Sequence, residues 1–288
     1  MKIGFLGTGL MGEPMAEKIL KANHQVIAYN RTKSKLEPLK TAGAEIAESP
    51  AEVIKDADCV ILMLSDAAAI KSLVLSESAK KELSGSTILQ MGTISPQESK
   101  AIRDEVVAAG GEYLEAPVLG SIPQVKSGSL IVMVGATPEQ FQRYLSLFKI
   151  FSPEPLLIGE VGTGAALKLA MNQLIGSLTT AFSLSLGLIM RQGIEIETFM
   201  KVVRESVLYA PHFDKKLERM VDRNFANPNF PTKHMLKDTK LFINAAESLG
   251  LDVSLQEGVR QVLEKTIELG LGDEDYSALF SGVNPEEK

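Results

Sequence analysis

The sequence predicts an α/β protein in which a doubly wound, mostly parallel sheet is followed by a second domain built only of helices. Up to about residue 160, short apolar runs rich in β-forming residues alternate with helical patterns, as expected for βαβ units. After the glycine-rich segment 159–164 the strand patterns nearly stop, and helical patterns continue to the end. We therefore expect two domains, spanning residues 1–161 and 162–288.

The elements of the first domain follow from apolar runs of strand length and from prolines that begin helices. Proline is tolerated in the first helical turn because its missing N–H would have no partner there. The predicted strands are Lys2–Leu6, Gln25–Tyr29, Ala44–Ile46, Cys59–Leu64, Thr87–Gln90, Glu112–Glu115, Leu130–Val134 and Pro155–Ile158. The predicted helices include Glu13–Ala22, Pro50–Ala57, Pro96–Ala109 and Pro138–Phe148.

The second domain is expected to hold longer helices and a short closing turn after Asp275. The predicted helices are Ala165–Gln192, Ile196–Glu205, Pro211–Asp222, Met235–Leu249 and Val253–Leu269. The stretch Leu174–Met190 carries no charge, but it is short for a membrane span, contains serine and threonine, and is closely flanked by Lys168 and Arg191. We expect a helix buried between domains or subunits, and no membrane partner.

The first strand runs directly into a glycine-rich turn, Gly7-Thr8-Gly9-Leu10-Met11-Gly12. Such a turn presents backbone N–H groups and a helix N-terminus to a pyrophosphate. Gly7 permits the tight turn, Gly9 lets the phosphates approach, and Gly12 lets the helix pack on the strand. Glycine turns are common, but a second strand follows where a βαβ unit needs it. The first domain is therefore predicted to be a Rossmann-type dinucleotide-binding domain.

The end of the second strand bears on the choice between NAD and NADP. An NAD site usually has an acidic residue about twenty residues after the glycines, where it bonds the ribose 2′-hydroxyl. Here the chain reads Asn30-Arg31-Thr32-Lys33-Ser34-Lys35 and holds no acid. The guanidinium of Arg31 suits a 2′-phosphate, and Thr32 and Lys35 add a hydroxyl and a charge. A solvated basic loop is the alternative, and we expect NADP(H).

Composition argues against several classes of function. The 288 residues carry a net charge of −6 without a basic patch accompanied by aromatic residues, so we expect no nucleic-acid partner. The first strand begins at residue 2, which leaves no room for a targeting segment ahead of it. The one cysteine, Cys59, lies in an apolar run and cannot form an internal disulfide. We expect a cytoplasmic location, an inert core thiol and no metal site.

The helix that begins at Ala165 carries the most suggestive cation, Lys168, among alanine, leucine and methionine residues. Asn172 follows one turn later on the same face. A lysine on an apolar helix near a nucleotide site can donate a proton, or a hydrogen bond, to a carbonyl oxygen that is being reduced. The alternative is an ordinary lysine whose stem is buried while its charge reaches water, and spacing alone favours it.

Three further segments join strands or loops to helices, and each is weakly informative by itself. Phe230–Asp238 is a loop that enters a helix with mixed charges in its first turn. Glu115–Ser121 is a strand end running into a glycine turn, where backbone N–H groups can hold a carboxylate. Met91–Pro96 joins a strand to a helix begun by proline. Their order along the chain is more informative than any one of them.

Together these segments resemble the β-hydroxyacid dehydrogenase family, which includes 3-hydroxyisobutyrate dehydrogenases, tartronate semialdehyde reductases and glyoxylate/succinic semialdehyde reductases. The resemblance covers essentially the whole chain. It rests on Gly7–Ala16, Gly92–Pro96, Glu115–Val118, Gly128–Leu130, Gly162–Asn172, Lys237-Asp238 and Gly270–Ala278. The glyoxylate/succinic semialdehyde reductase branch looks the most similar, through Asn30–Thr32, Gly120-Ser121 and Phe230–His234.

The resemblance implies roles for particular residues. Lys168 would be catalytic, and Asn172 would support it and help to hold the substrate carboxylate. The substrate-binding residues would be Gly120, Ser121, Phe230 and Asp238. The cofactor-binding residues would be Gly7, Gly9, Leu10, Met11, Gly12, Asn30, Arg31, Thr32, Lys35, Leu64, Thr93 and Lys237. The family's oligomers imply a homodimer or homotetramer built on the helical domains.

Several positions depart from the family pattern. Leu119 stands where a serine is common, which removes a hydroxyl expected at the substrate carboxylate. Gly92 also stands where a serine is usual, and Lys18 replaces an asparagine of the first helix. Asn23 replaces a glycine, and asparagine tolerates the left-handed turn that glycine would make. Leu119 leaves the identity of the preferred substrate open.

We predict an NADPH-dependent reductase of small aldehyde acids, glyoxylate to glycolate and succinic semialdehyde to 4-hydroxybutyrate, by hydride transfer with Lys168 as proton donor. The nearest alternative is a 3-hydroxyisobutyrate-type dehydrogenase that uses NAD, against which Arg31 argues. A 6-phosphogluconate dehydrogenase usually needs a longer helical domain, and an imine reductase usually lacks the lysine. A catalytically silent NADP-binding module is the alternative from another class. Lys168 and Asn172 disfavour it, while Leu119 mildly favours it.

Overall fold

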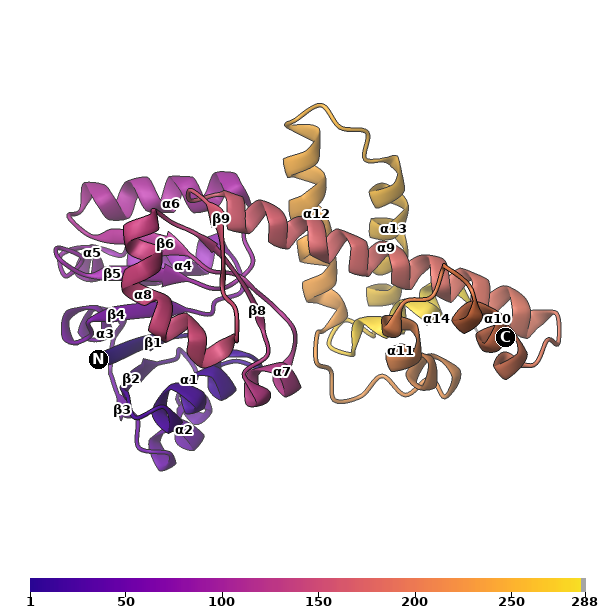
Figure 1. The fold of residues 1–288 in the computed structure, drawn as a ribbon, viewed down its shortest axis with the longest axis horizontal. Helices are drawn as coiled ribbons and strands as arrows, with labels where there is room; N and C mark the ends of the chain where they lie inside the picture. The colour runs from indigo at the N-terminus through magenta and orange to yellow at the C-terminus, as the bar shows by residue number, and fades with distance from the viewer. Residues whose placement is uncertain (286–288) are drawn as a thin grey trace. The chain divides into compact units, whose positions relative to one another are not determined.

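A computed structural model of the chain describes residues 1–285 (Figure 1). The chain divides into two compact units, Met1–Leu169 and Ala170–Lys288, and the division falls inside one long helix. Each unit has hydrophobic clusters of its own: two are made of side chains between residues 3 and 161, and two of side chains between residues 175 and 283. The domain boundary expected after residue 161 stays a prediction.

The first unit is built on a nine-stranded sheet. Its strands are β1 (Lys2–Leu6), β2 (Gln25–Tyr29), β3 (Glu45–Ile46), β4 (Cys59–Leu62), β5 (Thr87–Gln90), β6 (Glu112–Glu115), β7 (Val118–Leu119), β8 (Ile131–Gly135) and β9 (Leu156–Gly159). The order is β3-β2-β1-β4-β5-β6-β8-β7, with β9 paired to β8. Among the described strands, β8 pairs antiparallel with β6 and β7 and parallel with β9, and the remaining pairs are parallel. The order reverses between β1 and β4, and doubly wound sheets bind ligands at the carboxyl ends of strands at such a point.

Helices cover both faces of this sheet (Figure 1). They are α1 (Gly12–Lys21), α2 (Glu37–Thr41), α3 (Pro50–Asp56), α4 (Ala67–Val74), α5 (Glu77–Lys80), α6 (Pro96–Ala108), α7 (Ile122–Ser127) and α8 (Pro138–Phe151). Phe5 and Leu6 of β1 enter different hydrophobic clusters, because successive strand side chains point to opposite faces. The cluster with Phe5 includes residues of α1, α2, α7 and α8, and the other includes residues of α3 to α6.

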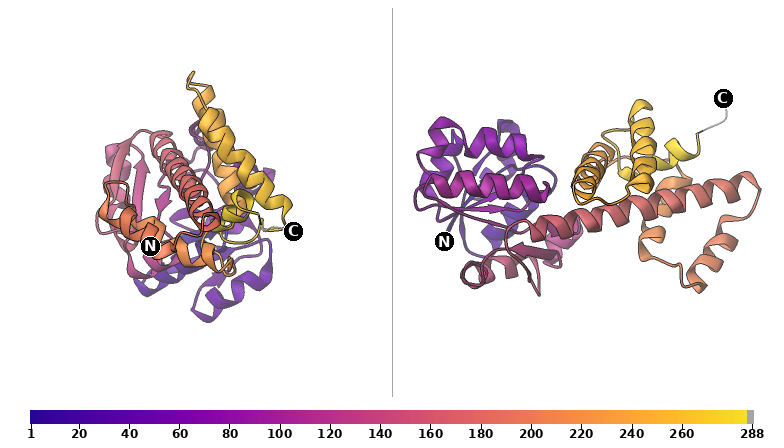
Figure 2. Two further views of the ribbon diagram at one scale, coloured as in Figure 1. Left: turned by 90° about the vertical axis from the view of Figure 1, so that its right-hand side faces the viewer. Right: turned by 90° about the horizontal axis from the view of Figure 1, so that it is seen from above.

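The second unit is helical. Its elements are α9 (Thr163–Arg191), which begins in the first unit, α10 (Ile196–Glu205), α11 (Pro211–Val221), α12 (Thr232–Glu247), α13 (Ser254–Glu268), a 3₁₀ turn η2 (Tyr276–Ala278) and α14 (Leu279–Val283). Figure 2 shows α9 as one unbroken helix, and α12 packs along α13. An isolated bridge joins Pro231, just before α12, to Asp275, just before η2.

The predicted fold class is confirmed, and the predicted strands differ from the observed ones by at most two residues at either end. The predicted start of α12 was late, because the helix begins at Thr232 directly after Pro231. The helix predicted over Pro138–Phe148 continues to Phe151. Sequence reasoning missed β7, whose residues were interpreted as part of a strand end and glycine turn, and α7, for which no element was predicted. Both are short and flank Gly120, so they carry little periodicity.

Within residues 1–285, α9 alone is long and apolar enough to cross a membrane by length and composition. Its polar side chains have the partners expected of a central helix. Thr179 lies 2.8 Å from His212 of α11, and the Asn172 amide donates to Asp238 of α12 (2.6 Å). Through these contacts α9 packs against α11 and α12 within the second unit.

Candidate active site

The glycine turn after β1 has the geometry of a closely packed phosphate loop. Gly7 has a φ of 97°, and a Cβ atom there would lie 2.4 Å from the carbonyl oxygen of Met63. A Cβ atom on Gly12 would lie 2.0 Å from the Gly7 carbonyl oxygen, so packing requires glycine at both positions. At Gly9, by contrast, nothing lies within 4 Å of such an atom. This open side of the turn fits a pyrophosphate.

Side chains tie this turn to the loop after β2. The Asn30 amide donates to the Thr8 hydroxyl oxygen (2.8 Å), and the Thr32 backbone N–H donates to the Asn30 side-chain oxygen (2.9 Å). The Thr8 hydroxyl donates to the Lys35 carbonyl oxygen (3.2 Å). Arg31, Thr32 and Lys35 are exposed next to this network. The structure therefore joins the glycine turn at residues 7–12, predicted to bind the pyrophosphate, to the loop at residues 30–35, predicted to bind the 2′-phosphate. Thr8, which links them, was missed.

The other predicted cofactor residues of the first unit also follow the carboxyl ends of strands. Leu10 is exposed and Met11 is half-buried where α1 begins, and Leu64 and Thr93 are half-buried after β4 and β5. A Cβ atom on Gly92 would lie 2.7 Å from the Leu64 carbonyl oxygen. Close packing of the two strand ends therefore explains why this chain has glycine at a position where the family usually has serine.

Gln90, at the end of β5, is a buried polar residue that sequence reasoning missed. It is 1% exposed, and its side-chain oxygen accepts a hydrogen bond from the Gly92 N–H (3.2 Å). Its amide nitrogen, Nε2, has no hydrogen-bond partner among residues 1–285. A buried donor without a partner, at the edge of the sheet where ligands bind, fits a polar group of a bound ligand.

The turn after β7 holds two residues predicted to bind the substrate. Gly120 has a φ of 134°, a conformation that favours glycine. The Ser121 N–H and hydroxyl both donate to the Gln124 side-chain oxygen, at 3.0 and 2.9 Å. Ser121 can therefore donate to a carboxylate only if Gln124 releases one of these bonds. At the other end of α7 the Lys18 ammonium donates to the Lys126 carbonyl oxygen (3.0 Å), so this departure from the family pattern stabilises the short helix.

Helix α9 carries the predicted catalytic pair. Lys168 is 9% exposed and Asn172 is 4% exposed, so the chain buries a lysine that spacing alone would assign to the surface. In the second unit the Asn172 amide donates to one Asp238 carboxylate oxygen, Oδ2, at 2.6 Å. The Lys237 ammonium lies 2.8 Å from the other oxygen, Oδ1. Asn172 and Lys237 therefore both contact Asp238, and all three are predicted site residues of the second unit.

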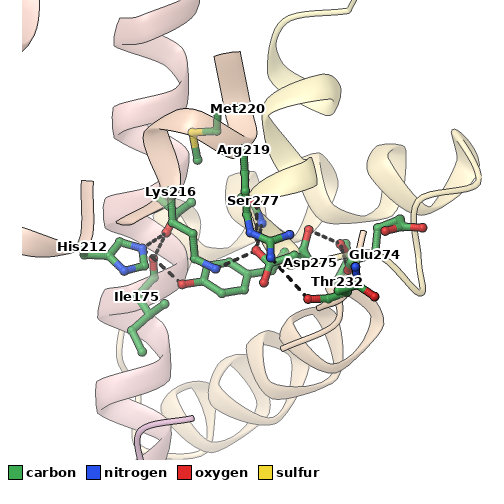
Figure 3. Close-up of polar contacts among 12 residues, drawn as sticks. Ile175, His212, Lys216, Arg219, Met220, Thr232, Glu274, Asp275 and Ser277 are labelled. Atoms are coloured by element: carbon green, nitrogen blue, oxygen red, sulfur yellow. Dashed lines mark hydrogen bonds and ion pairs between the residues drawn. The ribbon is translucent and has the colours of Figure 1, made fainter. Parts of the chain in front are cut away.

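Phe230, the fourth predicted residue of the second unit, packs against Tyr276. The ring centroids are 5.8 Å apart in an edge-to-face arrangement, and the Tyr276 N–H donates to the Phe230 carbonyl oxygen (3.0 Å). The Lys216 ammonium lies over the Tyr276 ring, 4.3 Å from its centroid. Figure 3 shows Lys216 extending toward Asp275, which it contacts at 2.7 Å. A buried ion pair therefore supports the segment that carries Phe230.

Burial and pairing set the protonation of this network. Burial raises the pKa of the Asp275 carboxyl, but the Lys216 ammonium outweighs it and holds that pKa below its usual range. Burial and the Lys216 charge lower the pKa of His212 to about 4. The Thr179 hydroxyl donates to the Ile175 carbonyl oxygen (2.6 Å), which leaves the Thr179 oxygen to accept a hydrogen bond from Nε2 of the neutral His212 ring (2.8 Å).

Other reactive groups are few in the part of the chain that the structure describes. Residues 1–285 contain no group of three or more histidine, cysteine, aspartate or glutamate side chains placed to hold a metal ion. Cys59 is a buried free cysteine in β4, and burial raises the pKa of its thiol to about 12. A thiol with so high a pKa is a poor nucleophile at neutral pH.

Two known protein families match successive parts of the chain. Residues 2–159 match the NAD binding domain of 6-phosphogluconate dehydrogenase. Residues 162–282 match a family described as NAD-binding of NADP-dependent 3-hydroxyisobutyrate dehydrogenase. The two matches together cover almost the whole chain.

Whole-chain relatives agree with the family matches. The chain is 33% identical to glyoxylate/succinic semialdehyde reductase 1 of Arabidopsis thaliana, over 98% of each protein. It is 30% identical to the chloroplastic glyoxylate/succinic semialdehyde reductase 2 of the same plant, over 98% of this chain and 79% of that protein. A solved structure of 3-hydroxyisobutyrate dehydrogenase from Salmonella typhimurium superposes with a TM-score of 0.87 at 23% identity, covering 98% of this chain and 99% of the other. The last likeness concerns the fold.

Proposed function

We propose that this chain, which belongs to the β-hydroxyacid dehydrogenase family, reduces small aldehyde acids with NADPH. Family membership makes it an NAD(P)-dependent oxidoreductase that acts on CH–OH groups. The proposed substrates are glyoxylate and succinic semialdehyde, which the names of two whole-chain relatives contain. The products are glycolate and 4-hydroxybutyrate.

The observation that carries this proposal is the burial of Lys168 on a helix that also carries Asn172. NADPH, when bound, supplies the hydride that the aldehyde carbon accepts. The aldehyde oxygen then gains negative charge and needs one proton. A buried ammonium stabilises such a charge more strongly than an exposed one, because water screens it less, and Lys168 can donate the proton.

Several features of the first unit support NADP(H) as the cofactor. The open side of the glycine turn at Gly9 accommodates the pyrophosphate, and the buried donor of Gln90 offers a hydrogen bond at the same sheet edge. The exposed cations Arg31 and Lys35 follow β2, where an NAD site would have an acid. A guanidinium and an ammonium suit the 2′-phosphate that distinguishes NADP.

We also propose that the chain forms a homo-oligomer through its helical unit. Only a third of the most apolar window of α9 is buried within this chain. Leu174 is 49% exposed, Leu184 64% and Leu188 62%, and all three lie on α9. Exposed leucines repeated along one helix are typical of a surface that a partner covers. Light scattering of the purified protein tests this, and a monomer at micromolar concentration would contradict it.

The proposed reaction is tested by following NADPH consumption with a panel of short aldehyde acids, each repeated with NADH. We expect turnover of glyoxylate and succinic semialdehyde, with NADPH preferred. Oxidation of 3-hydroxyisobutyrate by NAD as the faster reaction would instead support the dehydrogenase alternative. NADPH binding without turnover of any aldehyde would support a silent module.

A further inference from the structure

Glu115, the last residue of β6, is a buried carboxylate that the proposed chemistry does not use. It is 1% exposed. Its Oε1 accepts hydrogen bonds from the backbone N–H groups of Gly162 (2.7 Å) and Ala165 (3.0 Å), where α9 begins. Its Oε2 accepts from the Ser99 hydroxyl of α6, which also lies 2.9 Å from the Tyr113 hydroxyl. Both carboxylate oxygens therefore have partners, and one of them holds the first turn of α9.

The carboxylate has little room to move. A Cβ atom on Gly135 of β8 would lie 2.5 Å from Glu115 Oε1. A Cβ atom on Gly164 of α9 would lie 3.3 Å from the same oxygen and 2.6 Å from the Met133 carbonyl oxygen. Both glycines thus lie against the carboxylate, and a methyl group at either would displace it or the helix.

The first N–H groups of a helix have no partner within the helix, and burying them unpaired is costly. Glu115 satisfies two of them. Burial raises the pKa of the Glu115 carboxyl, although the hydrogen bonds from Ser99, Ala165 and Gly162 oppose this effect. The anchor therefore joins β6, α6 and α9 through one side chain inside the first unit.

We propose that Glu115 is a positioning residue for Lys168, an inference that rests on the function proposed above. Lys168 follows Ala165 by three residues, or about 4.5 Å along the helix axis. The Lys168 N–H bonds to the Gly164 carbonyl in regular helix geometry, so a shift of the first turn carries the lysine with it. Misplacing a catalytic group by about 1 Å can cost roughly a hundredfold in rate. The anchor therefore controls turnover without contacting the substrate.

The test compares Glu115→Gln with Glu112→Gln, a matched control at the start of the same strand. Glu112 is half-buried and pairs with Arg143 of α8 at 2.9 Å. For Glu115→Gln we expect kcat with glyoxylate to fall by about tenfold or more, with KM and the NADPH dissociation constant within about twofold of wild type. Hydrogen exchange at residues 162–168 should become faster. Glu112→Gln should leave all four quantities unchanged.

A double-mutant cycle with Lys168→Ala separates positioning from a general loss of stability. If Glu115 acts through Lys168, Glu115→Gln lowers kcat no further once Lys168 is alanine. An equal fold-loss in both backgrounds overturns the proposal, and so does wild-type kcat in Glu115→Gln. Should Glu115→Gln fail to fold, Glu115→Asp replaces it, because it keeps the charge but withdraws the carboxylate by one methylene group. The same outcomes then apply.

Failure of the proposed function would be recognised separately. If the wild-type protein reduces no aldehyde acid, the function is wrong, whereas hydrogen exchange still reports on the anchor. Unchanged exchange at residues 162–168 in Glu115→Gln would overturn the anchor whatever the activity. Two results together support the proposal. Glu115→Gln speeds hydrogen exchange at residues 162–168, and it lowers kcat only when Lys168 is present.

Discussion

Each of the two units buries a carboxylate, and the two units stabilise it in different ways. In the first unit Glu115 accepts hydrogen bonds from backbone N–H groups and a hydroxyl, so both of its oxygens have partners. In the second unit Asp275 is 0% exposed and pairs with the Lys216 ammonium, and one of its oxygens, Oδ2, has no hydrogen-bond partner among residues 1–285. The backbone N–H groups hold the Glu115 carboxylate in place, but they do not offset the effect of burial on its pKa. The Lys216 ammonium does offset that effect at Asp275 and keeps this carboxyl ionised.

The two carboxyl groups respond to pH with opposite sign. The pKa of Glu115 is raised by burial in the fold, so its contribution to the free energy of unfolding is present at low pH and is lost as pH rises through the folded value. The pKa of Asp275 is lowered, because Lys216 outweighs burial. Its contribution is present above the ordinary value of 3.8 and is lost as pH falls through the folded value.

The largest expected effect on stability comes from Lys216→Met. This change leaves the Asp275 carboxylate buried without its counter-charge, and breaking a buried pair in this way costs about 3–5 kcal/mol. Urea denaturation measures it, with Lys215→Met, an exposed neighbour, as the matched control. Adding Asp275→Asn to Lys216→Met should recover part of the loss. Equal stability of Lys216→Met and Lys215→Met would mean that the pair contributes nothing to the second unit.

The second expected effect is acid sensitivity through His212. Its pKa is lowered from 6.5 to about 4 by burial and the Lys216 charge, so the unfolded chain takes up a proton there before the folded chain does. Stability should therefore fall as pH drops from 6.5 to about 4, by as much as about 3 kcal/mol. His212→Phe, compared with His24→Phe in the first unit, should flatten this dependence. A slope identical in the two variants would assign the acid sensitivity to other groups.

The third prediction concerns exposed charge in the first unit. Arg31→Asp removes the guanidinium and places a negative charge near the expected 2′-phosphate. We expect NADPH affinity to fall by roughly ten- to hundredfold, with NADH affinity nearly unchanged. Fluorescence titration measures both. Equal NADPH affinity in wild type and variant would show that the phosphate binds elsewhere.

The smallest expected effect is that of Leu119→Ser. Leu119 lies in β7, opposite Ile131 of β8, next to the Gly120 turn. A serine there would restore the hydroxyl that the family usually has, and one neutral hydrogen bond contributes about 1 kcal/mol. We expect a lower KM for glyoxylate and no change in NADPH affinity. Weaker glyoxylate turnover would instead identify Leu119 as a pocket wall adapted to another substrate.

The fold was largely predictable because its elements are local patterns. The apolar strand Lys2–Leu6 and the glycine turn that follows it at Gly7 can be recognised from a few adjacent residues. The contacts of Glu115 were not predictable, because they join it to Gly162 and Ala165, 47 and 50 residues away. Lys216 and Asp275 are 59 residues apart, and nothing in helical periodicity connects them. Motifs therefore named Glu115 and Asp275 as residues, whereas the long-range contacts that these side chains make were visible only in the structure.

The most direct test of the account is the turnover of Lys168→Ala with NADPH and glyoxylate. General acid catalysis and electrostatic stabilisation are each worth roughly a hundredfold or more, so kcat should fall by at least about two orders of magnitude with NADPH affinity intact. Lys168→Arg should rescue little, because a guanidinium does not readily give up a proton. Near-wild-type kcat in Lys168→Ala would contradict the proposed role of this lysine.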